Sequence, residues 1–292
     1  VAATLSAGVE IQRLVKQGMA PSQAAIAYSP ISIQRISLFN AATDYQQFLA
    51  STVIPALLHI LAMVIGATTI GRELRDKRIG HWYAFIDTGR PNLTALIDNE
   101  ALSTLDNKQT RSDDPEISES LKKNQQVSIA VLIFGLLGKY FWPMLAYSIW
   151  SALALWLATP QQTVALASMV VTYIGLILLM MLSFWLGAIF TLNSFSLRMG
   201  LSATGFISAP SYAFAGVTFP YIAISDSAQH WSNILPLTHY LKLHIAQLQM
   251  HAPVAISLPI IYGLTLATLI AMGLTAVLSK RALARPERWG AR

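Results

Sequence analysis

The chain has no cysteine and only about half the usual share of charged residues. Without cysteine it forms no disulfide and offers no thiolate to a metal, so a disulfide-stabilised fold and a cysteine-ligated zinc site are excluded. Charged residues make up 12% of the chain, whereas a soluble domain has roughly 25%. Hydrophobic residues make up 54% and the mean hydropathy is +0.51. These values are typical of a membrane protein.

Motifs for catalysis and for nucleotide binding are absent as well. The phosphate-binding pattern G-x-x-x-x-G-K-[ST] does not occur, and the similar stretch 135–140 is too short and has Tyr140 where Ser or Thr is needed. No G-x-S-x-G pattern surrounds a serine, and no H-E-x-x-H pattern could bind zinc. We therefore predict no catalytic residue and no metal site in this chain.

Five apolar segments approach the length of about 20 residues that a transmembrane helix needs. They cover about residues 49–70, 141–158, 164–192, 197–219 and 254–278. The stretch 220–253 is too polar to span and too apolar for a free loop. Residues 127–137 are apolar but too few to span alone, and they either lie at the interface or extend the second span.

The remaining segments are more polar. Residues 1–48 are predicted to be the end of a small extracytoplasmic α+β domain, with a short helix ending near Gly18 and a strand in the nearly alternating run 31–38. Residues 98–126 carry charges of both signs among Ser, Asn and Gln, which indicates a solvated loop. We treat residues 49–292 as the transmembrane domain.

The basic residues are distributed unequally between the two sides of these five spans. Sixteen Lys or Arg residues fall on one side and four on the other, so the first side is predicted to be cytoplasmic. This places the C-terminus inside and the N-terminus outside, and we expect an earlier transmembrane helix before Val1. Because most of the basic residues lie on the predicted cytoplasmic side of the spans, we attribute the net charge of +6 to membrane orientation and predict no nucleic-acid partner.

A basic and amphipathic stretch, residues 71–97, follows the first span. Ile79, Trp82, Tyr83 and Ile86 are spaced i, i+3, i+4 and i+7, so they share one face of a helix. Such a helix beside a membrane either binds anionic lipid headgroups or contacts a partner protein. The predicted contact residues are Arg72, Glu73, Arg75, Ile79, Trp82, Tyr83 and Ile86.

Two features lie within the predicted spans themselves. Gly205, Ala209 and Ala213 recur at four-residue spacing, the small-xxx-small pattern of close helix contact, either within one subunit or between subunits. His59 lies in the middle of the first span, where an ionisable group is either functional or a neutral histidine bonded to a neighbouring carbonyl.

Several short motifs resemble those of the membrane subunit, or permease, of ABC-2 type exporters, in the subgroup with a large extracytoplasmic domain after the first helix. They are the run 33–40, the charged span end 71–73 (GRE), the span start 138–140 (GKY), and the pair 213–220 (AFAGVTFP) and 235–240 (LPLTHY). The resemblance covers about residues 30–97 and 138–280, and residues 98–137 look like an insertion.

The resemblance implies a fold and roles for these residues. The five spans correspond to helices two to six of a six-helix permease, and the stretch 71–97 docks in a groove of the ATPase. The small-residue face lies at a dimer interface and lines the substrate path, and the last motif pair marks a broken fifth helix that forms an outer gate. The implied interface residues are Gly205, Ala209, Ala213 and Gly216, and the implied gate residues are Phe219, Pro220, Pro236, His239 and Tyr240.

From these features we expect an all-α polytopic membrane protein of the bacterial inner membrane that acts as the permease of an ATP-driven exporter. It is expected to be a homodimer or to pair with a second permease, with membrane lipids around it. ATP and Mg²⁺ are expected on a separate ATPase, and this chain is expected to bind no cofactor. A transport-inactive scaffold or assembly factor is the alternative, and a membrane-embedded hydrolase is a third hypothesis. The sequence does not indicate the substrate.

Overall fold

The structure of the 292-residue chain is a computed structural model, and it describes residues 9, 11–21, 23–24, 45–88, 128–159, 164–217, 221 and 224–290. The chain divides into two units, Val1–Leu38 and Phe39–Arg292. In the first unit, residues 11–16 are helical, as predicted. The predicted strand at 31–38 and the predicted loop at 98–126 lie outside the described residues, so the extracytoplasmic α+β domain stays a prediction.

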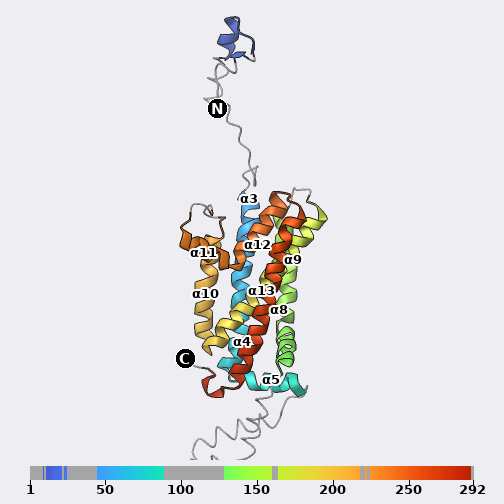
Figure 1. The fold of residues 1–292 in the computed structure, drawn as a ribbon, viewed down its shortest axis with the longest axis vertical. Coiled ribbons are helices and arrows are strands. Elements are labelled where there is room, and N and C mark those ends of the chain that lie inside the picture. Colours follow the sequence, from blue (N-terminus) through green and yellow to red (C-terminus); the bar gives the residue numbers. More distant parts are fainter. Residues whose placement is uncertain are drawn as a thin grey trace, which may run out of the picture. The chain divides into compact units, whose positions relative to one another are not determined.

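In the described part of the second unit all regular elements are helices, in agreement with the predicted all-α fold class. Figure 1 shows its longer helices running side by side, with α5 lying across one end of the bundle. We call this the α5 end and the opposite one the α12 end. The elements are α3 (Tyr45–Phe48), η1 (Leu49–Val53), α4 (Ile54–Arg75), α5 (Ile79–Thr88), α8 (Ile129–Ala158), α9 (Leu166–Ser194), α10 (Leu197–Phe214), α11 (Asp226–Ile234), α12 (Pro236–His244), η3 (Ile245–Gln249), α13 (Val254–Leu283) and η4 (Pro286–Arg288).

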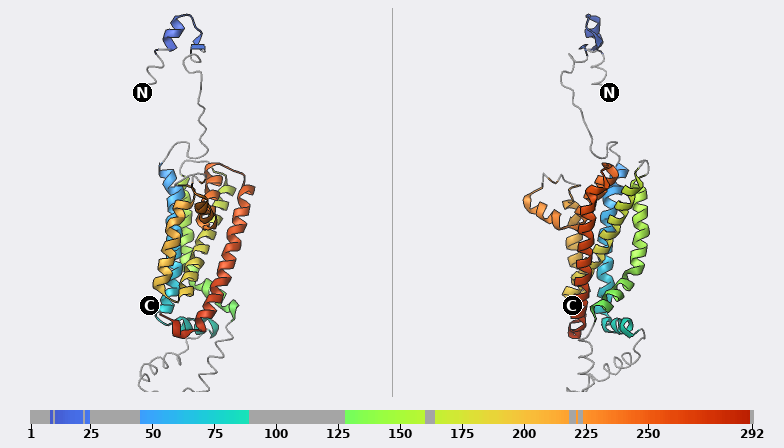
Figure 2. Two further views of the ribbon diagram at one scale, coloured as in Figure 1. Left: turned by 60° about the vertical axis from the view of Figure 1, so that its left-hand side comes forward. Right: turned by 45° about the vertical axis from the view of Figure 1, so that its right-hand side comes forward.

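Within the described residues, four helices are long and apolar enough to cross a membrane: Leu49–Arg75, Ile129–Ala158, Leu166–Ser194 and Val254–Leu283. They are compatible with a multi-pass membrane protein. The other predicted span is the 18-residue helix α10, which lies in the same bundle (Figures 1 and 2). Because α10 contains Arg198 and many small polar residues, its composition alone does not mark it as a span. The fifth span therefore stays a prediction.

The second predicted span is longer than its apolar core suggested. Helix α8 begins at Ile129, and the apolar residues 129–137 continue into the rest of the helix without a break. Of the two arrangements open for these residues, the structure shows the extension of the span. Part of the region that looked like an insertion is thus a part of the bundle, and α8 places Lys139 opposite α4.

Helix α9 lies at the centre of the bundle, packed by α4, α8, α10, α12 and α13. Its contact with α4 is made by glycines. A Cβ atom on Gly66 would collide with the backbone carbonyl of Phe184, and one on Gly187 would collide with the backbone of Met63 and Ala67. The two backbones therefore touch directly, as small residues allow in helix packing. We call this contact the α4–α9 seam.

The described part of the stretch 220–253 forms the two short helices α11 and α12 and the π-helical turn η3. Leu235 has an extended backbone (φ −78°, ψ 124°) between α11 and α12, and Pro236 is the first residue of α12. A proline at this position is favourable because the first helical N–H has no partner within the helix. Most of α12 is buried against the bundle, including Leu237, Tyr240 and Leu241.

Candidate functional site

The amphipathic helix α5 presents its apolar face to the bundle. Ile79 is fully buried and Tyr83 is 9% exposed, while Trp82 and Ile86 pack against the core. Both of the latter side chains lie against Gly135 of α8. These four residues were predicted to contact a partner, and this stays a prediction. In the structure they pack between α5 and the rest of the bundle, and Trp82 and Ile86 are only partly buried. The periodicity correctly predicted the shared face but could not tell what covers it.

A different part of α5 is exposed. Phe85 is 54% exposed, and Asp87, two residues further along the helix, is exposed as well. Lys77 and Arg78 are exposed in the turn before α5. A partner that docks at this end would meet these four side chains rather than Ile79 or Tyr83.

The predicted contact residue Glu73 is engaged within the chain. Its Oε1 lies 2.6 Å from Nζ of Lys139, and the same ammonium lies 5.1 Å from the centre of the Trp82 ring. This arrangement joins α4, α5 and α8 at one point. Lys139 received no partner from the sequence, although a single charge inside an apolar helix is itself a signal of a polar partner.

The two predicted arginines at this corner are exposed. Arg75 Nε donates to Asp76 Oδ1 at 2.8 Å, and this hydrogen bond is the main reason why the pKa of Asp76 lies below its usual value. Arg72 is exposed on the last turn of α4. A pocket of about 660 Å³ lies between α5 and the first turns of α8, lined among others by Trp82, Phe85 and Phe134.

The C-terminal segment contacts the same corner, which sequence reasoning missed. The Trp289 ring lies against Gly80 of α5, and its Nε1–H donates to the carbonyl of Ala282 at 2.7 Å. Gly290 has a positive φ of 73° and lies close to the carbonyl of Arg75. The end of α13 is thereby held against the α4–α5 turn.

The predicted small-residue face of α10 points away from the rest of the bundle. Gly205, Ala209 and Ala213 are exposed, and a Cβ atom on Gly205 would meet no other atom within 4 Å in the described part of the chain. Gly216 follows the helix with a positive φ of 78°. The alternative was that this face packs within one subunit. Among the described residues, no side chain or backbone covers Gly205 in this way.

The opposite face of α10 is buried and polar. Thr204 and Ser208 are fully buried, and in the described part of the chain their hydroxyl oxygens have no hydrogen-bond partner. Tyr212 on the same helix lies with its hydroxyl 3.1 Å from Oγ1 of Thr52. This contact joins α10 to η1, the π-helical turn directly before α4.

His59 is fully buried where α4 meets α9. Its Nδ1 lies 2.6 Å from Oγ of Ser183, and that hydroxyl lies 2.5 Å from the carbonyl of Leu179. If the hydroxyl donates to the carbonyl, it accepts from Nδ1–H of His59. The expected partner was a carbonyl, and the structure shows a serine instead. No group of three metal-binding side chains occurs among the described residues.

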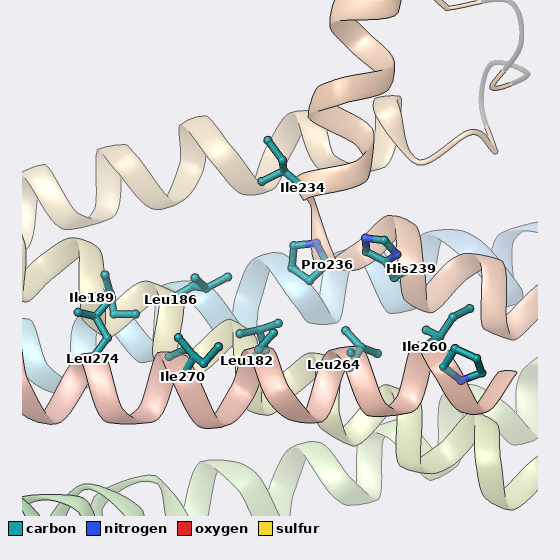
Figure 3. Close-up of a pocket in the computed structure, with 14 residues that line it drawn as sticks. Leu182, Leu186, Ile189, Ile234, Pro236, His239, Ile260, Leu264, Ile270 and Leu274 are labelled. Atoms are coloured by element: carbon teal, nitrogen blue, oxygen red, sulfur yellow. The ribbon is translucent and has the colours of Figure 1, made fainter.

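The residues of the predicted outer gate lie in different surroundings. Pro236 and His239 line a pocket of about 650 Å³ between α9, α12 and α13 (Figure 3). Tyr240 is fully buried with its hydroxyl 3.0 Å from Nδ1 of His244, so it belongs to the core of the bundle. Phe219 and Pro220 lie outside the described residues.

Comparison with known proteins adds no relative to these observations. No family model matches the chain, no curated protein matches it, and no solved structure matches it. What the chain does is therefore inferred from its own residues and their arrangement.

Proposed function

We propose that the chain is the permease subunit of an ATP-driven exporter of the ABC-2 type, which forms the substrate path and is driven by a separate ATPase. In this proposal ATP and Mg²⁺ bind the ATPase, and this chain performs no chemistry on the substrate. The protein lies in the bacterial inner membrane with the α5 end and the C-terminus in the cytoplasm, and α10 is the fifth span. The first unit, which makes up most of the predicted segment 1–48, belongs to an extracytoplasmic domain.

The observation that supports this proposal best is the connection of α5 to three other parts of the bundle. It follows α4 directly, it packs on α8 through Trp82 and Ile86, and Trp289 holds it to the end of α13. A force on the exposed Phe85 side of α5 therefore reaches both α4 and α8. Helices that are joined so closely move as units, which is how closure of an ATPase would be transmitted.

The α4–α9 seam would form the second half of the route by which motion is transmitted from α5. Because Gly66 and Gly187 bring the two backbones into contact, α4 cannot shift without moving α9. Helix α9 in turn packs against α10, α12 and α13. We infer that motion at the α5 end is carried through this seam to α10 and the pocket beside α12.

The proposed dimer uses the outward face of α10. Gly205, Ala209 and Ala213 are small, exposed and at four-residue spacing, so a second helix could approach closely there. The partner in this dimer is a second copy of the chain or a second permease. The substrate path would then lie beside α10.

Photo-crosslinking tests the contact with the ATPase. A photoreactive amino acid replaces Phe85 on α5 or, as the control, Trp231 on α11, since these two aromatic side chains are 54% and 53% exposed. We expect an adduct with a protein that carries a P-loop at position 85 and none at position 231. Adducts with lipid alone at position 85 would contradict the proposal and support simple headgroup binding.

A second experiment separates transport from a scaffold role. Glu73→Gln and Lys139→Gln each break the ion pair that joins α4 to α8, and Glu73→Lys combined with Lys139→Glu restores it in reverse. We expect the single variants to keep the ATPase bound while ATP-dependent export falls, and the double variant to recover export. Bound ATPase without export in the unmodified protein would favour the scaffold.

A further inference from the structure

The pocket beside α12 is an elongated apolar groove with one polar end. On α13 its lining runs from Pro259 to Leu274, which at about 1.5 Å per residue is roughly 22 Å of helix. Its volume of about 650 Å³ lies in the range of small-molecule sites, roughly 300–1,000 Å³. Figure 3 shows Leu274 and Ile189 at one end of the groove and His239 beside Ile260 at the other.

The walls of the groove favour a hydrocarbon chain. His239 is the one lining residue with a polar side chain, and the others are apolar residues, proline or glycine. A polar ligand would lose its hydrogen bonds to water there without replacing them, which is costly. Helices α9 and α13, which form two walls, are both candidate membrane spans, so the medium next to the groove is lipid. Its length exceeds half of a hydrocarbon core of about 30 Å, so a chain from one leaflet fits lengthwise.

A connected set of polar groups surrounds the His239 end of the groove. His239 Nε2–H donates to the carbonyl of Asn233 at 2.8 Å, and Asn233 Nδ2 donates to the hydroxyl of Tyr221 at 3.0 Å. Nζ of Lys242 lies 5.0 Å from the centre of the Tyr221 ring. Lys242 and His239 are three residues apart on α12, so their side chains are neighbours on the helix surface.

Lys242 gives this end a positive charge. It is the one Lys or Arg in the sequence between Arg198 and Lys280, and Asp226 is the one acidic residue in the same interval. Lys242 is exposed, and within the described part of the chain no carboxylate forms an ion pair with it. An anionic headgroup would therefore find a cation about one helical turn from the mouth of the groove.

We propose that this groove binds one acyl chain of an anionic membrane lipid, with the chain along α13 and the headgroup at Lys242. The lipid comes from the membrane around the protein. Its bound chain fills the space between α9, α12 and α13 and steadies the short helix α12 against the two spans. This site requires no ATPase, so it goes beyond the proposed function and can be tested separately from it.

The test uses the full chain in lipid nanodiscs that contain a phosphatidylglycerol with a photoreactive acyl chain. Mass spectrometry then locates the adducts. We expect them on residues 182–189 of α9 and 260–274 of α13. Unlabelled phosphatidylglycerol should compete with the probe, and phosphatidylcholine should compete less well. Labelling spread evenly over the exposed aromatic face of α8, which includes Trp142 and Trp150, would overturn the proposal by showing ordinary surrounding lipid only.

Two glycines of α13 provide a matched pair of variants. A Cβ atom on Gly263 or on Gly273 would meet nothing within 4 Å, but only Gly263 lines the groove. Gly263→Trp should fill the groove and lower the groove adduct by about tenfold, because an occupied site has no room for the chain. Gly273→Trp should leave it unchanged. Equal adducts in both variants would overturn the proposal.

Two more variants complete the test. Ala267→Phe fills the same groove from another position and replaces Gly263→Trp if that protein does not fold. Lys242→Gln should reduce the preference for phosphatidylglycerol over phosphatidylcholine by about fivefold, the effect expected of one lysine near an anionic surface. An unchanged preference would show that Lys242 does not hold the headgroup and would overturn that part of the proposal.

Discussion

Two sets of small residues in this bundle have opposite surroundings. In the α4–α9 seam, Gly66 and Gly187 lie so close to the facing backbone that no side chain fits. On α10, Gly205 and Ala209 are exposed, and the space beyond Gly205 is empty in the described part of the chain. The comparison shows that small residues mark a surface where helices can approach closely. It does not say whether the approaching helix belongs to the same chain.

The seam also contains polar side chains that form hydrogen bonds. His59 of α4 contacts Ser183 of α9, and Thr191 Oγ1 donates to the carbonyl of Gly187. In an apolar environment such polar contacts between and within helices avoid the cost of unpaired groups. The closed seam thus combines close approach with hydrogen bonds, whereas the α10 face offers close approach alone.

The largest expected effect comes from closing the space in the seam. Gly187→Ala places a methyl group on the backbone of Met63 and Ala67, so α4 and α9 must move apart. We expect a loss of roughly 3 kcal/mol in stability, at the upper end for over-packed interiors, measured as a fall in Tm in detergent. Gly205→Ala is the matched control, because the same methyl group meets open space. A similar fall in Tm for both variants would break the comparison.

The next effect concerns the open face. Gly205→Leu should leave the Tm of the monomer unchanged or raise it slightly, since leucine is a better helix former than glycine. In a dimer through α10 it would keep the two helices apart and weaken self-association by about tenfold. Single-molecule photobleaching in membranes measures the dimer fraction. An unchanged dimer fraction would place the interface, if there is one, on another face.

The smallest effect distinguishes paired from unpaired hydroxyls. Ser183→Ala leaves Nδ1 of buried His59 without its partner and should cost about 1–2 kcal/mol. Ser208→Ala removes a buried hydroxyl that has no partner among the described residues, so stability should change by less than about 0.5 kcal/mol. Chemical unfolding of both variants in the same detergent measures the difference. A larger loss for Ser208→Ala would indicate a partner outside the described residues.

Much of the helical framework could be predicted from the sequence. The long apolar runs predicted α4, α9 and α13 with ends within a few residues, because length and hydrophobicity are properties of one segment. The start of helix α8 was left open between two arrangements, since Gly138 and Lys139 interrupt its apolar pattern. The ion pair with Glu73, on a segment 66 residues away, is what makes that lysine acceptable there.

The candidate sites were less predictable, for a related reason. The spacing of Ile79, Trp82, Tyr83 and Ile86 predicted one face of a helix, and that helix exists. Whether this face meets lipid, another protein or the chain itself depends on where α8 and Trp289 lie. Phe85 received no role from the sequence, because exposure cannot be read from one aromatic residue in an amphipathic stretch.

The sequence by itself determined that this protein is built from long apolar helices and that its basic residues gather in a few of the segments between and after them, because each of these features is local. Tertiary structure decided which face of α5 is covered and which glycines lie against a facing backbone. It also decided that α9, α12 and α13 leave a groove between them. These outcomes depend on contacts between segments that are far apart in the chain. Their energies come from close packing between neighbours, and a sequence pattern does not name the neighbour.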